Sequence, residues 1–115
     1  MQKKPSQTSE RNINYNIVIS QRAEQHTDAI VSYVASELNN PLAAAAILSD
    51  IEQTISKLEY TASSFALCTN PYLCSREYRK VKLKRHNYLI LYRLKDNTVF
   101  ISGVFHMKEN YASKL

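Results

Sequence analysis

Hydrophobic and polar residues alternate with a period of two near both ends of the chain, which is the spacing of a strand with one buried face. Residues 13–20, INYNIVIS, place four large apolar side chains on one such face, namely Ile13, Tyr15, Ile17 and Ile19. Ser20 ends this segment, and its hydroxyl can accept a hydrogen bond from a free amide in the first turn of a helix. A short strand followed at once by a capped helix is therefore predicted.

The next part of the chain repeats apolar residues with the three-and-four spacing of helices. Residues 21–38 carry such a stripe at Ala23, Ile30, Val34 and Leu38. Asn40 and Pro41 suit the cap and the first position of a second helix. That helix is predicted over residues 41–58, with an apolar seam formed by Ala44, Leu48, Ile51, Ile55 and Leu58. The short link predicts an antiparallel hairpin, and we expect burial against a sheet for Leu48, Ile51 and Ile55.

Residues 60–75 show neither spacing and contain the loop-forming residues Ser, Thr, Asn and Pro. A loop of this length is uncommon unless it has a function or covers the core. We expect it to cover the core through Phe65, Leu67, Tyr72 and Leu73. Strand patterns then resume and predict three strands, over residues 76–86, 87–94 and 98–105, with a turn at 95–97.

This order of elements predicts an α+β fold. An N-terminal strand is followed by an antiparallel two-helix hairpin and then by a three-strand antiparallel meander, and the strands form one twisted sheet with the hairpin on one face. A chain of 115 residues is the length of one domain, which we assign to residues 13–115. Residues 1–12 are polar and patternless, and a disordered tail is expected there.

Composition excludes several classes of protein. The single glycine excludes the glycine-rich loops that hold dinucleotides or nucleoside triphosphates. No apolar run approaches the roughly 18 residues of a membrane span, and no signal peptide opens the chain, so a cytoplasmic protein without membrane contact is expected. Cys68 and Cys74 lack the paired spacing of a zinc site, and we interpret them as reduced thiols in a loop rather than a disulfide. No metal and no cofactor are expected.

Positive charge is concentrated in one segment. Residues 76–95 carry eight Lys or Arg residues against one acid, whereas the rest of the chain carries seven against nine. Such a basic stripe on a slightly acidic body is typical of proteins that bind nucleic acid or an acidic partner. Lysines also protect exposed edge strands from aggregation, and the charge alone leaves both interpretations open.

Strand alternation gives the two faces of this segment different chemistry. The even positions place mostly basic side chains on one face, at Arg76, Tyr78, Lys80, Lys82, Lys84 and His86. Metal-free cleavage of RNA needs cations for the charge on phosphorus, a base for the 2′-hydroxyl and an acid for the leaving oxygen. Lysines spaced by about 7 Å along a strand can supply the cations, and His86 can exchange protons near neutral pH. For a histidine taken alone, a surface or packing role is the commoner alternative.

Several stretches, taken in order, resemble a known family. They are the strand that ends in Ser20, the amphipathic helix after it, NPLAAAA, RKVKLKRHNYLILYRL, TVFISGVFH and Tyr111, and together they cover residues 15–111. This arrangement resembles the RelE/ParE superfamily, the toxins of bacterial type II toxin–antitoxin modules. The resemblance implies the α+β fold predicted above and a cognate antitoxin encoded by the adjacent gene. It also implies one of two targets, because RelE-like members cleave mRNA at the ribosome and ParE-like members poison DNA gyrase.

The resemblance further implies roles for individual residues. A catalytic set is expected at His106, Tyr111, Lys80, Lys82 and Lys84. RNA binding is expected at Arg76, Arg79, Arg85, His86 and Arg93. Leu89 and Met107 stand where many relatives carry basic residues. The loss of these two cations weakens the case for a nuclease. The expected function is a toxin that cleaves mRNA at the ribosome, with a gyrase poison or an inactivated toxin retained for its antitoxin as the alternatives.

Overall fold

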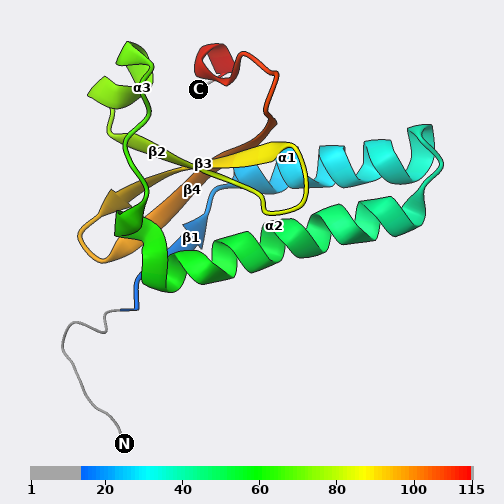
Figure 1. Cartoon of the computed structure of the whole chain (residues 1–115), viewed down its shortest axis with the longest axis horizontal. Coiled ribbons are helices and arrows are strands. Elements are labelled where there is room, and N and C mark those ends of the chain that lie inside the picture. Colours follow the sequence, from blue (N-terminus) through cyan, green and yellow to red (C-terminus); the bar gives the residue numbers. More distant parts are fainter. Residues whose placement is uncertain (1–13, 115) are drawn as a thin grey trace, which may run out of the picture.

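The computed structural model describes residues 14–114, and Figure 1 shows its elements coloured along the sequence. The helices are α1 (Gln21–Ser32), α2 (Pro41–Thr61) and α3 (Pro71–Ser75). Shorter helical turns follow α1, follow α2 and end the chain, at Tyr33–Glu37, Ala62–Ser64 and Tyr111–Lys114. The strands are β1 (Asn16–Ile19), β2 (Tyr78–Lys82), β3 (Tyr88–Lys95) and β4 (Thr98–His106). The tail predicted at residues 1–12 lies outside the described residues.

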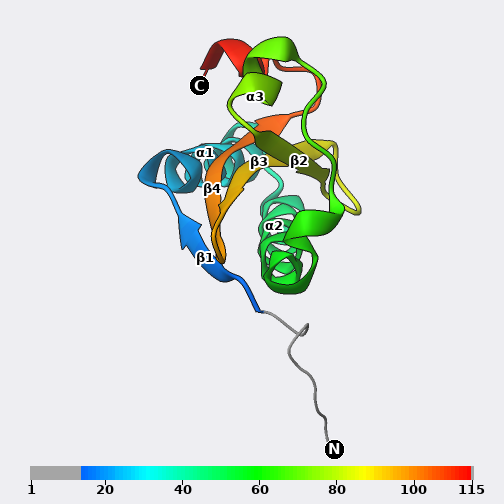
Figure 2. The ribbon, with the colours of Figure 1, turned by 90° about the vertical axis from the view of Figure 1, so that its left-hand side faces the viewer.

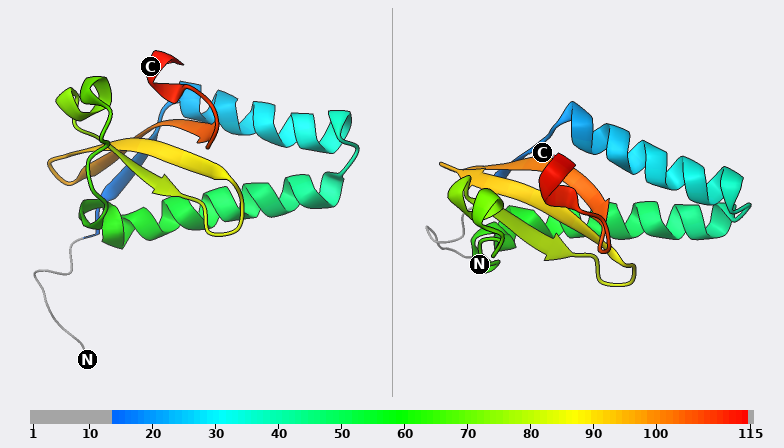
Figure 3. Two further views of the ribbon diagram at one scale, coloured as in Figure 1. Left: turned by 45° about the horizontal axis from the view of Figure 1, so that its top comes forward. Right: turned by 90° about the horizontal axis from the view of Figure 1, so that it is seen from above.

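The strands form one sheet in the order β1-β4-β3-β2. β1 pairs with β4 in parallel, whereas β2 with β3 and β3 with β4 pair antiparallel. Helices α1 and α2 run side by side in opposite directions and pack against this sheet, as Figures 2 and 3 show from different sides. The predicted α+β fold, with its helical hairpin and its antiparallel meander, is confirmed.

The sheet face that packs on the helices contains most of the core. Side chains that are at most 1 % exposed include Ile51 and Leu58 of α2 and Ile90 and Tyr92 of β3. The Tyr92 hydroxyl donates a hydrogen bond of 2.5 Å to the carbonyl of Ala62. Burial raises the pKa of Tyr92 to about 12. This phenol therefore ties the end of α2 to an inner strand of the sheet.

The apolar seam of α2 is only partly buried, which corrects one expectation. Ile51 reaches the core as predicted, but Leu48 and Ile55 are half-buried and line a groove between α1 and α2. Ile47 joins the core instead and is 6 % exposed, because the helix turns a slightly different side toward the sheet. Leu38 is exposed as well, since the π-helical turn that ends α1 carries it away from the predicted stripe.

Both predicted helix caps are confirmed. The Ser20 hydroxyl accepts a hydrogen bond of 3.0 Å from the N–H of Ala23. The Asn40 side chain accepts one of 3.1 Å from the N–H of Ala43, directly before Pro41. Each cap pairs one of the amides that a helix start leaves without an internal partner.

The segment predicted as a long loop contains a helix, α3. It begins at Asn70 and Pro71, the same cap-and-proline pair that begins α2. The Asn70 side chain accepts a hydrogen bond of 3.1 Å from the N–H of Leu73. Four apolar residues of this segment were expected to cover the core. Phe65 is half-buried and Leu73 is buried, whereas Leu67 and Tyr72 are exposed.

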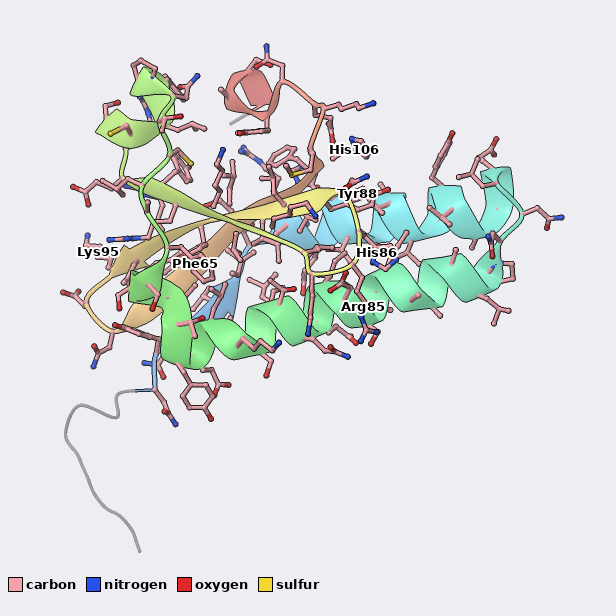
Figure 4. All side chains as sticks on the ribbon, in the orientation of Figure 1. Phe65, Arg85, His86, Tyr88, Lys95 and His106 are labelled. Atoms are coloured by element: carbon pink, nitrogen blue, oxygen red, sulfur yellow. The ribbon has the colours of Figure 1, made fainter. Side chains whose placement is uncertain are left out.

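β2 ends at Lys82 instead of continuing to residue 86. The carboxylate of Asp50 on α2 accepts hydrogen bonds from the N–H of Arg85 at 2.9 Å and from Nδ1 of His86 at 2.8 Å. These bonds draw residues 84–87 out of the sheet and toward α2, and Figure 4 labels the two side chains there. Lys84, which was expected on the basic strand face, therefore lies in the turn beyond the strand.

Candidate functional site

The sheet face opposite α1 and α2 carries the exposed lysines of β2. Strand register places Lys80 beside Leu91 and Lys82 beside Leu89 of β3. Both leucines are at most 2 % exposed, whereas both lysines are exposed. Two of the three predicted lysines thus share one strand face, and the third, Lys84, does not.

A small second core supports this face. Leu89 and Leu91 pack there with Phe105 of β4, under α3 and the C-terminal turn. Figure 1 shows α3 and the C-terminal turn on the side of the sheet away from α2. The ring of Tyr111 lies with its centroid 5.9 Å from that of Phe105. The apolar floor therefore holds the ring of Tyr111 near the basic edge of the sheet.

Lys80 and Tyr111 meet although they are far apart in the sequence. The Lys80 ammonium donates a hydrogen bond of 3.4 Å to the Tyr111 hydroxyl. Lys82 follows on the same face of β2 and donates to the carbonyls of Leu83 and His86 at 3.3 and 3.4 Å. Of the predicted catalytic set, Lys80, Lys82 and Tyr111 are the members that the structure places on one face.

His106 organises the turn that leads to Tyr111. Its Nδ1 accepts a hydrogen bond of 3.1 Å from the N–H of Lys108. Its own backbone N–H donates one of 2.8 Å to the carboxylate of Glu109. A nitrogen that accepts a hydrogen bond carries no proton, so the neutral ring holds its proton on Nε2. His106 thereby sets the path of the chain toward Tyr111.

The side chain of His106 lies on the other side of the sheet from the lysines. Its register partner is Tyr88, and the two rings meet edge to face with centroids 5.3 Å apart. Figure 4 shows both residues at the end of the sheet. Successive side chains of a strand point to opposite faces, and Phe105 occupies the lysine face. The structure therefore does not place His106 beside Lys80.

Asp50 is the buried charge of the described residues and is 6 % exposed. Its burial acts to raise the pKa of the carboxyl. Hydrogen bonds from His86 and from the backbone of Arg85 and Lys84, together with the charge of His86, outweigh burial and lower the pKa. Asp50 is therefore ionised at neutral pH and fixes the basic turn on α2. Asp50 was not among the predicted residues, although an acid directly before the core residue Ile51 was an available signal.

Two of the predicted RNA-binding arginines lie over tyrosine rings. The Arg76 guanidinium lies 3.7 Å from the ring centroid of Tyr72. The Arg93 guanidinium lies 5.4 Å from that of Tyr78. Stacking of this kind orients a guanidinium without neutralising it. Both arginines are exposed, so their charges are available to an anion.

The other two arginines differ from these and from each other. Arg79 is opposite Tyr92 in the register of β2 and β3, which places it on the helix-covered face. Its guanidinium donates to the carbonyl of Phe65 and so fastens the segment after α2. Arg85 is exposed in the turn that Asp50 holds.

The cysteines and the acidic residues offer no metal site in the described chain. Cys68 and Cys74 are both free. Burial raises the pKa of Cys68, and the charge of Lys80 offsets part of that rise, so Cys68 remains a thiol. Within residues 14–114, no three His, Cys, Asp or Glu side chains gather in a way that could hold a metal ion. No helix in this range is long and apolar enough to cross a membrane.

Comparison with known proteins gives one family and two related structures. The family described as "ParE toxin of type II toxin-antitoxin system, parDE" matches residues 17–111. The chromosomal ParDE toxin–antitoxin system from P. aeruginosa contains a chain of similar structure, with a TM-score of 0.68 at 20 % identity over 82 % of this chain and 97 % of that one. A double arginine-to-alanine mutant of the E. coli toxin RelE in the free state gives 0.59 at 15 % identity, over 89 % and 93 %. Identities this low show a shared fold. No curated protein is significantly similar in sequence.

Proposed function

The chain belongs to the ParE toxin family of type II toxin–antitoxin systems, a membership that leaves its target open between gyrase and mRNA, and we propose that it arrests growth by cleaving mRNA at the ribosome. Membership of the family implies a cognate antitoxin as the partner of this chain. What we propose is the target on which the toxin acts. The observation that supports mRNA is the contact between Lys80 and Tyr111 on an exposed basic face.

Lys80 and Lys82 bind the RNA backbone in this proposal. Neither forms an ion pair with a carboxylate of the described residues. Alternate residues of a strand stand about 7 Å apart, so the two ammonium groups can contact neighbouring phosphates of one strand. Such binding weakens with salt and is largely independent of base sequence. Choice of the cleavage site is then left to the ribosome, which presents the message.

Tyr111 serves as the proton donor of the reaction. The 2′-hydroxyl oxygen attacks the adjacent phosphorus, and the bond from phosphorus to the 5′ oxygen breaks. The products are a 2′,3′-cyclic phosphate and a 5′-hydroxyl. Tyr111 gives its proton to the leaving 5′ oxygen, and the Lys80 ammonium at 3.4 Å stabilises the phenolate that remains.

The attacking 2′-hydroxyl also needs a group that accepts its proton, and in this proposal the ribosome supplies that group. The second core around Tyr111 consists of Cys68, Leu73, Leu89, Leu91 and Phe105, with Tyr78 and Ala112 at its margin, and Lys80 contacts the Tyr111 hydroxyl. These side chains include neither a carboxylate nor an imidazole. The ring of His26 packs against Phe105 with centroids 4.7 Å apart, but its Nδ1 already accepts a hydrogen bond from the N–H of Val104. His106 points to the other face. The proton of the 2′-hydroxyl is therefore accepted by a ribosomal group, and the isolated chain cleaves free RNA poorly. His106 acts as a positioning residue through the turn that leads to Tyr111.

The cognate antitoxin silences the toxin by covering this same face. An acidic segment that folds on binding matches the exposed lysines in charge and gains affinity from the many charge contacts. Co-expression of the adjacent gene should then restore growth. If the chain alone never slows growth and no product of its operon copurifies with it, neither growth arrest nor binding of an antitoxin can be its function.

Poisoning of DNA gyrase is the second candidate, and the floor of the site favours it. Leu89, Leu91 and Phe105 are at most 2 % exposed and occupy the centre of the face, where a nuclease gains most from further cations. A gyrase poison needs no reacting groups, so an apolar floor is no disadvantage to it.

A brief induction with two readouts separates the candidates. Mapped mRNA 5′ ends report cleavage, and gyrase-linked DNA breaks report poisoning. New transcript ends that disappear in Tyr111→Phe and in Lys80→Ala/Lys82→Ala support the nuclease. Loss of one proton-transfer group typically costs about 10²- to 10⁴-fold in rate. Lys57→Ala, which removes an exposed cation of α2, is the matched control. Intact transcripts together with DNA breaks would refute mRNA cleavage.

A further inference from the structure

A second basic hollow lies on the same sheet face, at the hairpin between β3 and β4. Its volume is about 560 Å³, within the range of roughly 300–1,000 Å³ found for small-ligand sites. The side chains that line it include Arg76, Arg93, Lys95 and Phe100. Figure 4 shows Lys95 at the opposite end of the sheet from His106. The hollow is therefore separate from the turn that carries Tyr111.

Its charge is positive and unneutralised. Arg76, Arg93 and Lys95 are exposed, and none of them forms an ion pair with a carboxylate among the described residues. Glu77 is the acid of the lining, so three cations stand against one acid. Arg76 and Arg93 lie over tyrosine rings, which limits the positions that their guanidinium groups can take. Such a preorganised pair loses little freedom when it binds a phosphate.

An aromatic ring forms part of the same wall. Phe100 is 40 % exposed although it lies within an inner strand, and its neighbours Val99 and Ile101 are fully buried. It pairs with Arg93 in the strand register. A flat ring beside a guanidinium is the combination on which single-stranded nucleic acids stack their bases while their phosphates meet a cation.

We propose that this hollow, which we call the Phe100 pocket (Arg76, Arg93, Lys95 and Phe100), holds one nucleotide of a single-stranded nucleic acid. Its base stacks on the Phe100 ring, and its phosphate faces the two guanidinium groups. Where the strand is mRNA, the inference rests on the proposed function and gives the toxin a second contact with its substrate.

The strand register sets the path of that substrate. Arg93 is opposite Tyr78 on β2, and Lys80 is the next residue of β2 on the same face. Alternate residues of a strand stand about 7 Å apart, so a strand of nucleotides can run from the Phe100 pocket to the contact of Lys80 with Tyr111. The nucleotide in the pocket then lies one or two positions from the bond that is cleaved.

Binding of short oligonucleotides to the full chain tests the inference. The probes are fluorescently labelled hexauridine and hexadeoxyuridine, and binding is measured by anisotropy. Phe100→Leu keeps an apolar side chain without the ring, and it should weaken binding about 5- to 150-fold, the range for loss of one base–aromatic stack. Phe100→Tyr keeps a ring and should bind as the wild type does. Arg93→Gln should weaken binding and reduce the slope of log affinity against log salt by about 0.7.

Two controls keep the outcome specific. Lys57→Gln removes one positive charge from α2, away from the pocket, and should leave the affinity within about 2-fold of wild type, as the loss of a distant screened charge predicts. A hexauridine with an abasic centre should respond to Arg93→Gln but not to Phe100→Leu. Thermal unfolding of each variant shows whether it is folded. Tighter binding of hexauridine than of hexadeoxyuridine, which lacks only the 2′-hydroxyl groups, identifies RNA as the ligand, and the reverse identifies DNA.

The results that would overturn the inference are distinct from those that refute mRNA cleavage. If the Phe100→Leu and Arg93→Gln variants are folded and bind both probes like the wild type, the Phe100 pocket does not hold a nucleotide. A hexaglutamate peptide that binds as tightly as hexauridine, with no effect of Phe100→Leu, assigns the pocket to an acidic protein segment instead. If transcripts stay intact in cells but the Phe100-dependent binding persists, the pocket stands and the proposed function fails.

Discussion

The two faces of the sheet are built from different side chains. The face under α1 and α2 is closed by large apolar residues, and its buried phenol, Tyr92, is hydrogen-bonded to α2. The opposite face has a smaller apolar floor at Leu89, Leu91 and Phe105. Exposed cations surround that floor, from Lys82 and Lys80 to the Phe100 pocket.

This difference separates stability from recognition within one small domain. Burial of apolar surface supplies most of the favourable free energy of folding, and the helix-covered face contains most of that surface. The cations of the open face are exposed, so their replacement should leave the apolar core unchanged. Substitutions on the helix-covered face should therefore mainly lower the free energy of unfolding. Substitutions on the open face should mainly reduce toxicity.

The largest loss of stability is expected from the helix-covered face. Leu58→Ala removes a side chain that is fully buried, and it should lower the free energy of unfolding by about 2–5 kcal/mol, as for other buried leucines. Leu42→Ala on the same helix, at a residue that is 84 % exposed, should change it by less than about 0.5 kcal/mol. Urea unfolding measures both. Equal losses would show that α2 does not carry the core.

Alkaline pH probes the same face through Tyr92. Burial raises the pKa of Tyr92 to about 12, from about 10 in an unfolded chain. The folded state thus holds this proton more tightly, so stability is intact below pH 10 and falls as the pH rises toward 12. The loss should reach about 2–3 kcal/mol, at about 1.4 kcal/mol for each unit of pKa.

Tyr92→Phe is the control for that titration, because it removes the ionisable group and keeps the ring. Urea unfolding at pH 9 and pH 11 should show a smaller decrease for this variant than for the wild type. Identical decreases would mean that other groups cause the loss and that the Tyr92 phenol is accessible to hydroxide.

Asp50 connects the two faces, and its removal should have an intermediate effect. Asp50→Ala leaves the N–H of Arg85 and the ring of His86 without their acceptor, which should cost about 1–3 kcal/mol at pH 7. The pKa of Asp50 is lowered in the folded state. Its contribution is therefore present above the usual value of about 3.9 and is lost as the pH falls through the lower folded value.

The difference between wild type and Asp50→Ala should accordingly shrink below pH 4 in urea titrations. Glu52→Ala, at an exposed acid of the same helix, should change stability by less than about 0.5 kcal/mol. A difference that stays constant from pH 7 to pH 3 would show that the charge of Asp50 contributes nothing.

Local patterns predict this fold well where one residue type decides the structure. Caps at Ser20 and Asn40 were predictable because a side-chain oxygen before a helix pairs a free amide. The same rule applies to Asn70 with Pro71, but the polar residues around that pair led to a loop prediction. The end of β2 was not predictable from alternation, because it depends on Asp50, which lies far away in the sequence.

The candidate site was predictable only in part for the same reason. Alternation put Lys80 and Lys82 on one face, and the structure agrees as far as β2 extends. The contact of Lys80 with Tyr111 joins the edge strand to the C-terminal turn, and strand spacing carries no information on such a pairing. The Phe100 pocket was also missed, because an apolar residue in a strand predicts burial unless the neighbouring elements leave it uncovered.

The smallest change in stability is expected at the lysines of the open face, and it comes with the complete loss of one activity. Lys80→Ala/Lys82→Ala removes two exposed side chains, and each should alter the free energy of unfolding by less than about 0.5 kcal/mol. Growth arrest should nevertheless disappear, because the anionic target loses its cations. The measurements are urea unfolding and colony counts after induction, with Lys57→Ala as the matched control that should remain toxic. A double variant that unfolds like the wild type and still arrests growth would show that toxicity does not depend on these two lysines.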